Sequence, residues 1–77
     1  MDDIISEFEK DQSHRVLASI SDFKGKKRID IRVWYKDDSD EELKPSKQGV
    51  NLPVERFKDL KKLMTDLENA LKEKKLL

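Results

Sequence analysis

The chain has 77 residues, and 44% of them are charged, with 17 lysines and arginines matched by 17 aspartates and glutamates. This length allows one domain, and so small a domain buries a modest share of its surface, so we expect self-association to bury more. The absence of cysteine excludes a disulfide framework and a thiolate metal site. No apolar run is long enough to span a bilayer and no secretory signal is recognised, so a membrane is not among the expected partners.

The charges are unevenly distributed along the chain. Residues 1–13 hold five acids and one lysine, residues 14–35 hold six lysines or arginines and two acids, and residues 36–43 hold five acids and one lysine. A basic block therefore lies between two acidic ones, and the local field matters more to a polyanion than the net charge does. In so charged a chain these clusters also arise without any function, so they leave nucleic-acid binding open.

The first twelve residues form an acidic segment in which three large apolar side chains are spaced as one face of a helix. Asp2 or Asp3 is suited to cap such a helix. Because chain ends are often poorly ordered, we interpret residues 1–12 as a flexible stub or a short helix, followed by the domain proper at 13–77. The three apolar residues are Ile4, Ile5 and Phe8.

Two strands joined by a tight turn are expected next. Residues 13–22 form the first strand, and residues 26–35 form the second, in which apolar and polar side chains alternate strictly. Gly25 lies in the turn and supplies a positive φ if the turn needs one. In the second strand Ile29, Ile31 and Val33 share an apolar face that requires a core, whereas Arg28, Asp30, Arg32 and Trp34 share a polar, cationic and aromatic face.

The second half of the chain predicts two short strands and a helix. The strands are expected around 41–44 and 49–52, after a polar turn at 36–42 and with a basic turn containing Pro45 between them. Pro53 begins the helix, because proline suits the first helical position. The helix carries a heptad-like apolar seam, which predicts a two-fold dimer with helix against helix. The seam consists of Phe57, Leu60, Met64, Leu67 and Leu71.

The residue types argue against an enzyme and for a binding surface. The chain has one histidine, no cysteine and no glycine-rich phosphate loop, and the carboxylates of 37–42 lie in a run of like charge without apolar shielding. No metal or cofactor is therefore expected. Aromatic rings interleaved with lysine and arginine are instead suited to stack bases and hold a phosphate backbone, although the same rings also suit a core or an interface. The candidate DNA-binding residues are Phe23, Lys24, Lys26, Arg32, Trp34, Tyr35, Lys44 and Lys47.

Residues 16–72 resemble the single-stranded-DNA-binding transcriptional coactivator family typified by positive cofactor four. The resemblance rests on the runs Ser19-Ile20-Ser21-Asp22-Phe23-Lys24-Gly25-Lys26, Ile29-Asp30-Ile31-Arg32 and Leu43-Lys44-Pro45, on Lys47 and Gly49, and on Leu52-Pro53-Val54-Glu55-Arg56-Phe57. It implies an α+β fold, with a curved four-stranded antiparallel sheet, one long C-terminal helix and a two-fold homodimer. It also implies binding of single-stranded DNA or melted duplex with little sequence preference.

The resemblance further implies roles for single residues. Phe23 would stack a base, Arg32 would be the central cation of the groove, and Tyr35 occupies the second aromatic site, with Trp34 as the alternative ring. The four lysines would hold the backbone. The expected partners are single-stranded DNA, a second copy of the chain, and transcription or replication proteins, in the nucleus of a eukaryote or in the nucleoid or cytoplasm of a bacterium or phage.

Several positions depart from the family pattern. Ser21 and Gln48 replace basic residues and Ser46 replaces a glycine, so weaker and less salt-dependent DNA binding is expected. The basic, serine-rich tail of eukaryotic members is replaced by the acidic segment at 1–12. A different class of function stays open: a dimeric protein-interaction module that acts as a transcription cofactor without contacting DNA.

Overall fold

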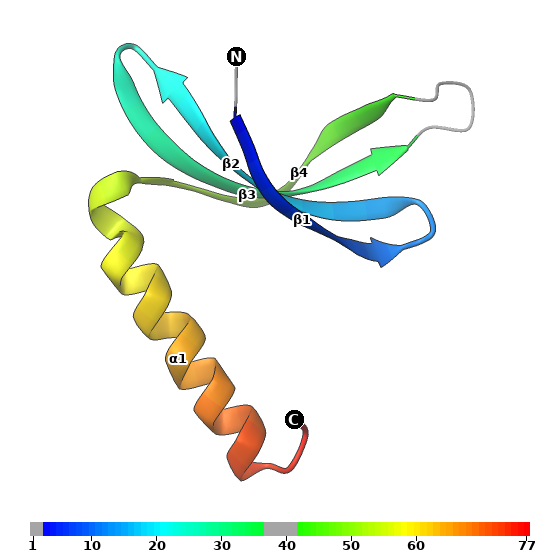
Figure 1. Cartoon of the computed structure of the whole chain (residues 1–77), viewed down its shortest axis with the longest axis vertical. Coiled ribbons are helices and arrows are strands. Elements are labelled where there is room, and N and C mark those ends of the chain that lie inside the picture. The colour runs from blue at the N-terminus through cyan, green and yellow to red at the C-terminus, as the bar shows by residue number, and fades with distance from the viewer. Residues whose placement is uncertain (1–2, 37–41) are drawn as a thin grey trace.

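Four antiparallel strands form one sheet, and a helix follows it (Figure 1). This computed structural model describes residues 3–36 and 42–77. The strands lie in the order in which they occur in the chain, and the architecture confirms the predicted α+β fold class. The elements are β1 (Asp3–Asp11), β2 (His14–Phe23), β3 (Lys26–Lys36), β4 (Leu43–Pro53), the 3-10 helix η1 (Val54–Arg56) and the helix α1 (Phe57–Glu73).

The β2–β3 hairpin matches its prediction closely. Its pairing runs without interruption from His14 opposite Tyr35 to Phe23 opposite Lys26. Only two residues form the loop, Lys24 with φ 53° and Gly25 with φ 80°. Two central residues with positive φ are typical of the turn whose twist matches that of paired strands. The expected positive φ at Gly25 is confirmed, and the turn fixes the register of every side chain along the hairpin.

The prediction for the N-terminal segment is wrong over Asp3–Asp11, which forms β1 rather than a flexible stub or a short helix. This strand pairs antiparallel with β2, from Asp3 opposite Ile20 to Asp11 opposite His14, and its register shifts between Ile4 and Ser6. The edge of β2 supplies hydrogen-bond partners for the backbone of this segment. Such pairing outweighs the weak tendency of a short segment to form a helix. Residues 1–2, including the candidate cap Asp2, lie outside the described part.

The prediction of two short strands separated by a basic turn is also wrong, because Leu43–Pro53 is one strand, β4. The expected turn is a bulge inside this strand. Arg32 is paired with Gly49 and Trp34 with Pro45, so a single β3 residue lies opposite the β4 residues 46–48. A bulge keeps the strand continuous while bending it. The acidic residues 37–41, with the beginning of the strand expected at 41, lie outside the described residues.

The helical part begins directly after β4. Pro53 is the last residue of β4 and the N-cap of η1. The first helical residue is therefore Val54, one position later than predicted. At the other end of α1, Lys75 has φ 59°, its N–H donates to the Lys72 carbonyl, and the Leu76 N–H donates to the Leu71 carbonyl. This pair of bonds is a Schellman motif, and it folds the last residues back towards the helix.

The two faces of the sheet differ in burial. One side of the sheet, which we call the polar face, carries Leu17, Ser19, Asp30 and Arg32, and the β2–β3 register brings these residues together. Gly49 and Asn51 lie opposite Arg32 and Asp30 on β4. The apolar face carries Val16, Ala18, Ile20, Ile29, Ile31 and Val33, with Val50 and Leu52 on β4. Leu17 is 2% exposed and Asp30 is 8% exposed, whereas Ile20 is 40% exposed.

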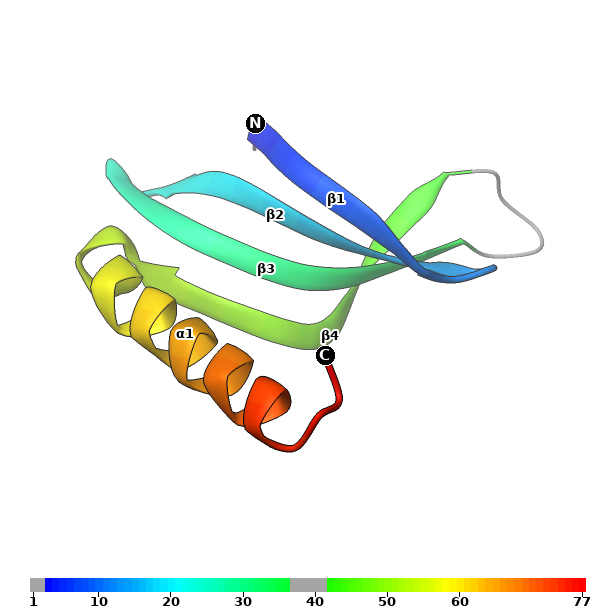
Figure 2. The ribbon, with the colours of Figure 1, turned by 60° about the horizontal axis from the view of Figure 1, so that its bottom comes forward.

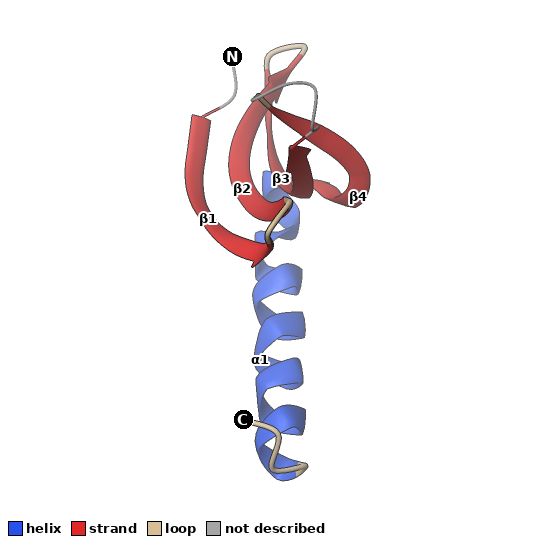
Figure 3. Cartoon of the chain, turned by 90° about the vertical axis from the view of Figure 1, so that its right-hand side faces the viewer, coloured by secondary structure: helices blue, strands red, loops and turns tan. Residues whose placement is uncertain are grey.

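This burial is the reverse of what the alternation predicts for a single chain, in which the apolar face was expected to contact the core. The strands bend strongly (Figure 3), and the ends of the sheet bend away from α1 (Figure 1). Bending brings side chains on the concave side together, so we place the polar face there. Figure 2 shows α1 on one side of the sheet, and Figures 1 and 3 show it running away from the strands. The predicted homodimer stays a prediction for this single chain.

Candidate nucleic-acid interface

An exposed aromatic ring and two lysines lie at the tip of the β2–β3 hairpin. Phe23 is 60% exposed and is paired with Lys26 across the two-residue turn. The Lys24 ammonium lies 5.3 Å from the centroid of the Phe23 ring, which is a cation–π contact. The tight turn therefore brings together three of the predicted residues, and it presents a ring with two positive charges beside it.

The centre of the polar face is a hydrogen-bonded network around Asp30. Arg32 donates from Nη2 to Oδ1 of Asp30 at 2.9 Å and from Nε to both carboxylate oxygens at 3.2 Å. Asn51 donates from Nδ2 to the same Oδ1 at 3.1 Å. Burial opposes ionisation of Asp30, but the bonds from Arg32 and Asn51 outweigh it, so the pKa of this carboxyl lies below its ordinary value.

Arg32, predicted as the central cation of the groove, is therefore paired rather than isolated. The hydrogen bond with Asp30 raises the pKa of its guanidinium, and its Nη1 donates to the Ser46 carbonyl at 3.0 Å. Three quarters of its side chain is buried, at 24% exposure. The Asp30 charge offsets much of the field that Arg32 would offer a phosphate. The geometry of Arg32 supports a role in positioning its neighbours at least as well as a direct contact with the DNA backbone.

The β4 bulge is held by the side chain of Ser46. The Ser46 hydroxyl donates to the Val33 carbonyl at 2.7 Å and accepts the Gln48 N–H at 3.1 Å. These bonds replace ladder bonds that the bulge disrupts. Lys47, another predicted cation, lies between Ser46 and Gln48 in the chain and is exposed. The bulge therefore projects a positive charge beside the Arg32 end of the polar face.

The two candidate rings at the end of β3 lie on opposite faces. Trp34 is paired with Arg15 and Pro45, so it shares the polar face with Arg32. Its Nε1 is buried, and no hydrogen-bond partner for it lies within the described residues. Tyr35 is paired with His14 and with Lys44, so both Tyr35 and Lys44 lie on the other face.

Six of the eight predicted residues thus form two groups, and Tyr35 and Lys44 lie apart from both on the other face. Phe23, Lys24 and Lys26 are at one end of the hairpin, whereas Arg32, Trp34 and Lys47 are near the other. Trp34 lies eight residues beyond Lys26 on β3, which at about 3.4 Å per residue is roughly 27 Å. One base cannot contact both groups, so a strand that uses both must run along the sheet.

Two residues that were not singled out as candidates from the sequence lie next to the first group. Arg28 donates from Nε to the side-chain oxygen of Asn51, and both line a hollow of about 330 Å³ together with Phe23, Ser21 and Asp22. The alternation placed Arg28 on the polar face. Only the β3–β4 register, in which Arg28 is opposite Pro53 and Asp30 is opposite Asn51, brings Asn51 to it.

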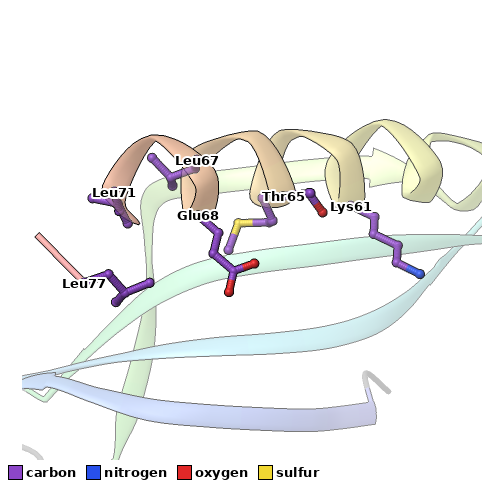
Figure 4. A pocket seen from close by; sticks show the side chains of 7 residues that line it. Lys61, Thr65, Leu67, Glu68, Leu71 and Leu77 are labelled. Carbon is purple, nitrogen blue, oxygen red and sulfur yellow. The ribbon is translucent and has the colours of Figure 1, made fainter. Parts of the chain in front are cut away.

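The helix stripe, defined as the five predicted dimer residues, is open to solvent over much of its length. Phe57, Met64 and Leu67 are about half exposed. Met64, Leu67, Leu71 and Leu77 line a groove of about 410 Å³ along α1 (Figure 4). The groove is also bordered by Lys61, Thr65 and Glu68. This stripe is available for a partner surface.

Neither a metal cluster nor a membrane span is found in the described part of the chain. Across residues 3–36 and 42–77, no group of three or more histidine, cysteine, aspartate or glutamate side chains is arranged to hold a metal ion. No helix there is long and apolar enough to cross a membrane.

A curved antiparallel sheet with a cationic and aromatic polar face, followed by a helix with an open apolar stripe, defines a small α+β fold with two exposed surfaces. The profile of the family described as Transcriptional Coactivator p15 (PC4) matches residues 10–63, and the chain belongs to this family. The resemblance inferred from the sequence is confirmed.

Individual relatives agree with this assignment. The chain is 40% identical over 60 residues to an RNA polymerase II transcriptional coactivator, KELP, of Arabidopsis thaliana, covering 78% of this chain and 35% of that protein. It is 33% identical over 51 residues to a putative RNA polymerase II transcriptional coactivator of Caenorhabditis elegans, covering 66% of this chain and 41% of that protein. The chain therefore spans well under half the length of these relatives.

A solved structure agrees over nearly the whole chain. It is described as a bacteriophage T5 homolog of the eukaryotic transcription coactivator PC4, implicated in recombination-dependent DNA replication. The TM-score is 0.68 at 26% sequence identity, covering 99% of this chain and 83% of that one. The matched part of this chain includes β1.

Proposed function

We propose that this chain is a homodimeric single-stranded-DNA-binding protein that acts in transcription or in DNA replication, recombination or repair. The observation that carries the proposal is the hairpin tip, where an exposed Phe23 ring lies between Lys24 and Lys26. A duplex hides the faces of its bases, whereas an unpaired base can stack on such a ring. Membership of a coactivator family and likeness to a phage protein implicated in replication support the same class of function.

In this proposal the strand runs along the polar side of the sheet, from the hairpin tip towards the bulge. Phe23 stacks a base, and Lys24, Lys26 and Lys47 contact phosphates. Arg32 and Trp34 shape the middle and far end of the path. Tyr35 and Lys44 lie on the other face, so they contribute only if the strand passes around the end of the sheet.

The homodimer is proposed from the helix stripe and the apolar face. Both are apolar, and both are substantially exposed in one chain. A second copy would cover them through an isologous contact, in which the same surface is used twice. Two polar faces would then be available in each assembly, one for each of two strands or for the two strands of melted duplex.

The test compares single-stranded and duplex DNA of equal length and mixed sequence by fluorescence anisotropy across a salt series. Tight single-strand binding that weakens with salt, with duplex clearly weaker, is the expected result. Phe23→Ala should lower the affinity about fivefold to a hundredfold, since stacking contributes roughly 1–3 kcal/mol per base. Phe8→Ala is the control, because Phe8 is an equally exposed ring that is paired with Val16 on the apolar face, away from the proposed DNA path; sedimentation establishes that this variant keeps the mass of the wild type.

Two results would overturn the proposal. Absence of single-strand binding at low salt is one, and it would favour the protein-interaction module. Equal affinity for single strands and duplex is the other, because a surface that recognises only phosphates does not distinguish them by stacking.

A further inference from the structure

The hollow at the hairpin end of the polar face combines an exposed ring with a positioned guanidinium. It has a volume of about 330 Å³ and is lined by Ser21, Asp22, Phe23, Arg28 and Asn51. Ser21 is small and uncharged. The hollow therefore has room beside the ring.

Arg28 is held in one orientation by Asn51. Its Nε donates to the Asn51 side-chain oxygen, and its Nη2 lies 3.4 Å from the Asn51 carbonyl oxygen. Asn51 is in turn fixed by its bond to Asp30. These contacts use Nε–H and one N–H of Nη2, so each Nη nitrogen still carries an N–H for a ligand. Two parallel donors on a fixed plane form a fork rather than a point charge.

The surroundings favour a neutral ligand over a phosphate. Asp22 lines the hollow and carries a carboxylate, bonded to Lys27 at 3.1 Å. Asp30 lies behind Asn51 as a second acid, and its lowered pKa keeps it ionised at neutral pH. A phosphate would face both carboxylates, whereas the edge of a base carries no net charge. The Phe23 ring also offers only one face, since Lys24 lies over the other.

We propose that this hollow reads one base of a bound single strand and prefers a base with two neighbouring acceptors, guanine or cytosine, over adenine and thymine. Guanine presents O6 and N7, and an unpaired cytosine presents O2 and N3, so either pair matches the two donors of the Arg28 fork. Adenine places an amino group where guanine has O6, and thymine separates its two carbonyl acceptors by N3–H. The base stacks on the free face of Phe23 while Arg28 bonds its edge. This inference rests on the proposed single-strand binding and adds a sequence preference to it.

The test uses thymine oligonucleotides of equal length in which isolated positions are replaced by guanine or by adenine, so that no quadruplex forms. Binding of the 77-residue chain is measured by anisotropy at fixed salt. We expect the guanine series to bind about fivefold to tenfold more tightly than the adenine series, a modest share of what a good bidentate contact contributes.

Arg28→Lys keeps the charge and loses the fork, so it should abolish the preference while changing affinity for pure thymine by less than about twofold. Arg28→Leu should also abolish it and weaken all binding slightly. Asn51→Ser should reduce the preference, because the guanidinium is no longer held. Arg56→Leu is the matched control; Arg56 lies in η1 and donates to Asp59, outside the hollow. Thermal melting establishes that each variant is folded.

The outcomes separate the two proposals. Equal binding of the guanine, adenine and thymine series would overturn the base-reading hollow and leave single-strand binding intact. A guanine preference that survives in Arg28→Lys would also overturn it, since another group would then be reading the base. Failure of the wild-type protein to bind any of the oligonucleotides would overturn the proposed function and this inference together.

Discussion

The two faces of the sheet differ in how complete they are within one chain. The polar face is internally bonded: Asp30 is joined to Arg32 and Asn51, and the fully buried Leu17 lies beside them. Parts of the apolar face, such as Ile20 and Val50, and much of the helix stripe stay exposed, and α1 runs away from the strands (Figures 1 and 3).

This difference separates two ways of satisfying a surface. Polar groups on the concave side are bonded to one another, so that side is formed before any ligand arrives. Apolar groups on the other side gain free energy only by leaving water, at about 25 cal/mol per Å² buried. We therefore expect substitutions on the polar face to alter the stability of the chain and its affinity for a ligand. Substitutions in the helix stripe should instead alter dimer formation.

The largest effect is expected from Leu67→Asp in the helix stripe. Leu67 is 48% exposed in the single chain, so the substitution leaves the sheet intact. In the proposed dimer the new carboxylate would be buried without a partner, at a cost of several kcal/mol. The dissociation constant of the dimer should therefore rise roughly a hundredfold or more. Sedimentation equilibrium measures the mass. Asn69→Asp adds the same charge on the opposite side of α1 and should stay dimeric; an unchanged mass for Leu67→Asp contradicts the proposed interface.

The next largest effect is expected at Gly49, which lies opposite Arg32 beside the bulge. Gly49 has φ 153°, and an added Cβ would clash with the Ile31 carbonyl oxygen and lie 2.7 Å from the Cα of Arg32. Both neighbours are backbone atoms, which do not move aside cheaply. Gly49→Ala should therefore destabilise the fold by about 2–3 kcal/mol in urea unfolding. Gly25→Ala is a useful contrast, since it is strained by φ alone; a smaller loss at Gly49 than at Gly25 would contradict the clash.

The hairpin and the helix stripe could be predicted because each is a local pattern. Alternation around Ile29 and Ile31, with Gly25 in the turn, specifies a strand register without knowledge of the rest of the chain. The 3-4 spacing from Phe57 to Leu71 likewise specifies a helical stripe. Family likeness then supplied the candidate roles of Phe23 and the lysines.

The remaining features depend on contacts between distant segments. β1 was missed because Ile4 and Phe8 are spaced as in a helix, and only pairing with β2 makes the segment a strand. The β4 bulge was predicted as a turn because Pro45 cannot donate to a ladder, whereas in the structure Ser46 bonds Val33 across the sheet and the strand continues. The pairing of the Arg32 charge with Asp30 depends on side-chain bonding, and the position of Asn51 depends on the β3–β4 register. Neither can be predicted from the spacing of neighbouring residues.

An intermediate effect is expected from Asp30→Asn, which keeps the shape of the side chain and removes its charge. The bonds from Arg32 become bonds to a neutral group, so we expect a loss of about 1–2 kcal/mol in unfolding free energy. Arg32 would then face the polar side without a compensating charge, and affinity for single-stranded DNA should rise a few-fold at low salt. Unfolding and anisotropy on one preparation measure both. A fall in stability with no rise in affinity would indicate that Arg32 only positions its neighbours.

The smallest effect is the pH dependence of stability, which distinguishes a buried carboxylate from an exposed one. Asp30 has a pKa below its ordinary value of 3.8, so its stabilisation is fully present above that value and is lost as the pH falls through the lowered pKa. Asp11 also has a lowered pKa, through hydrogen bonds from His14 and from the Ser13 N–H, but its carboxylate lies at the surface. Urea unfolding of wild type and both asparagine variants across the acid range should therefore show a clearly flattened slope for Asp30→Asn and a nearly unchanged one for Asp11→Asn. The reverse order would mean that the edge turn beside β1, rather than the polar network, sets the acid limit of the fold.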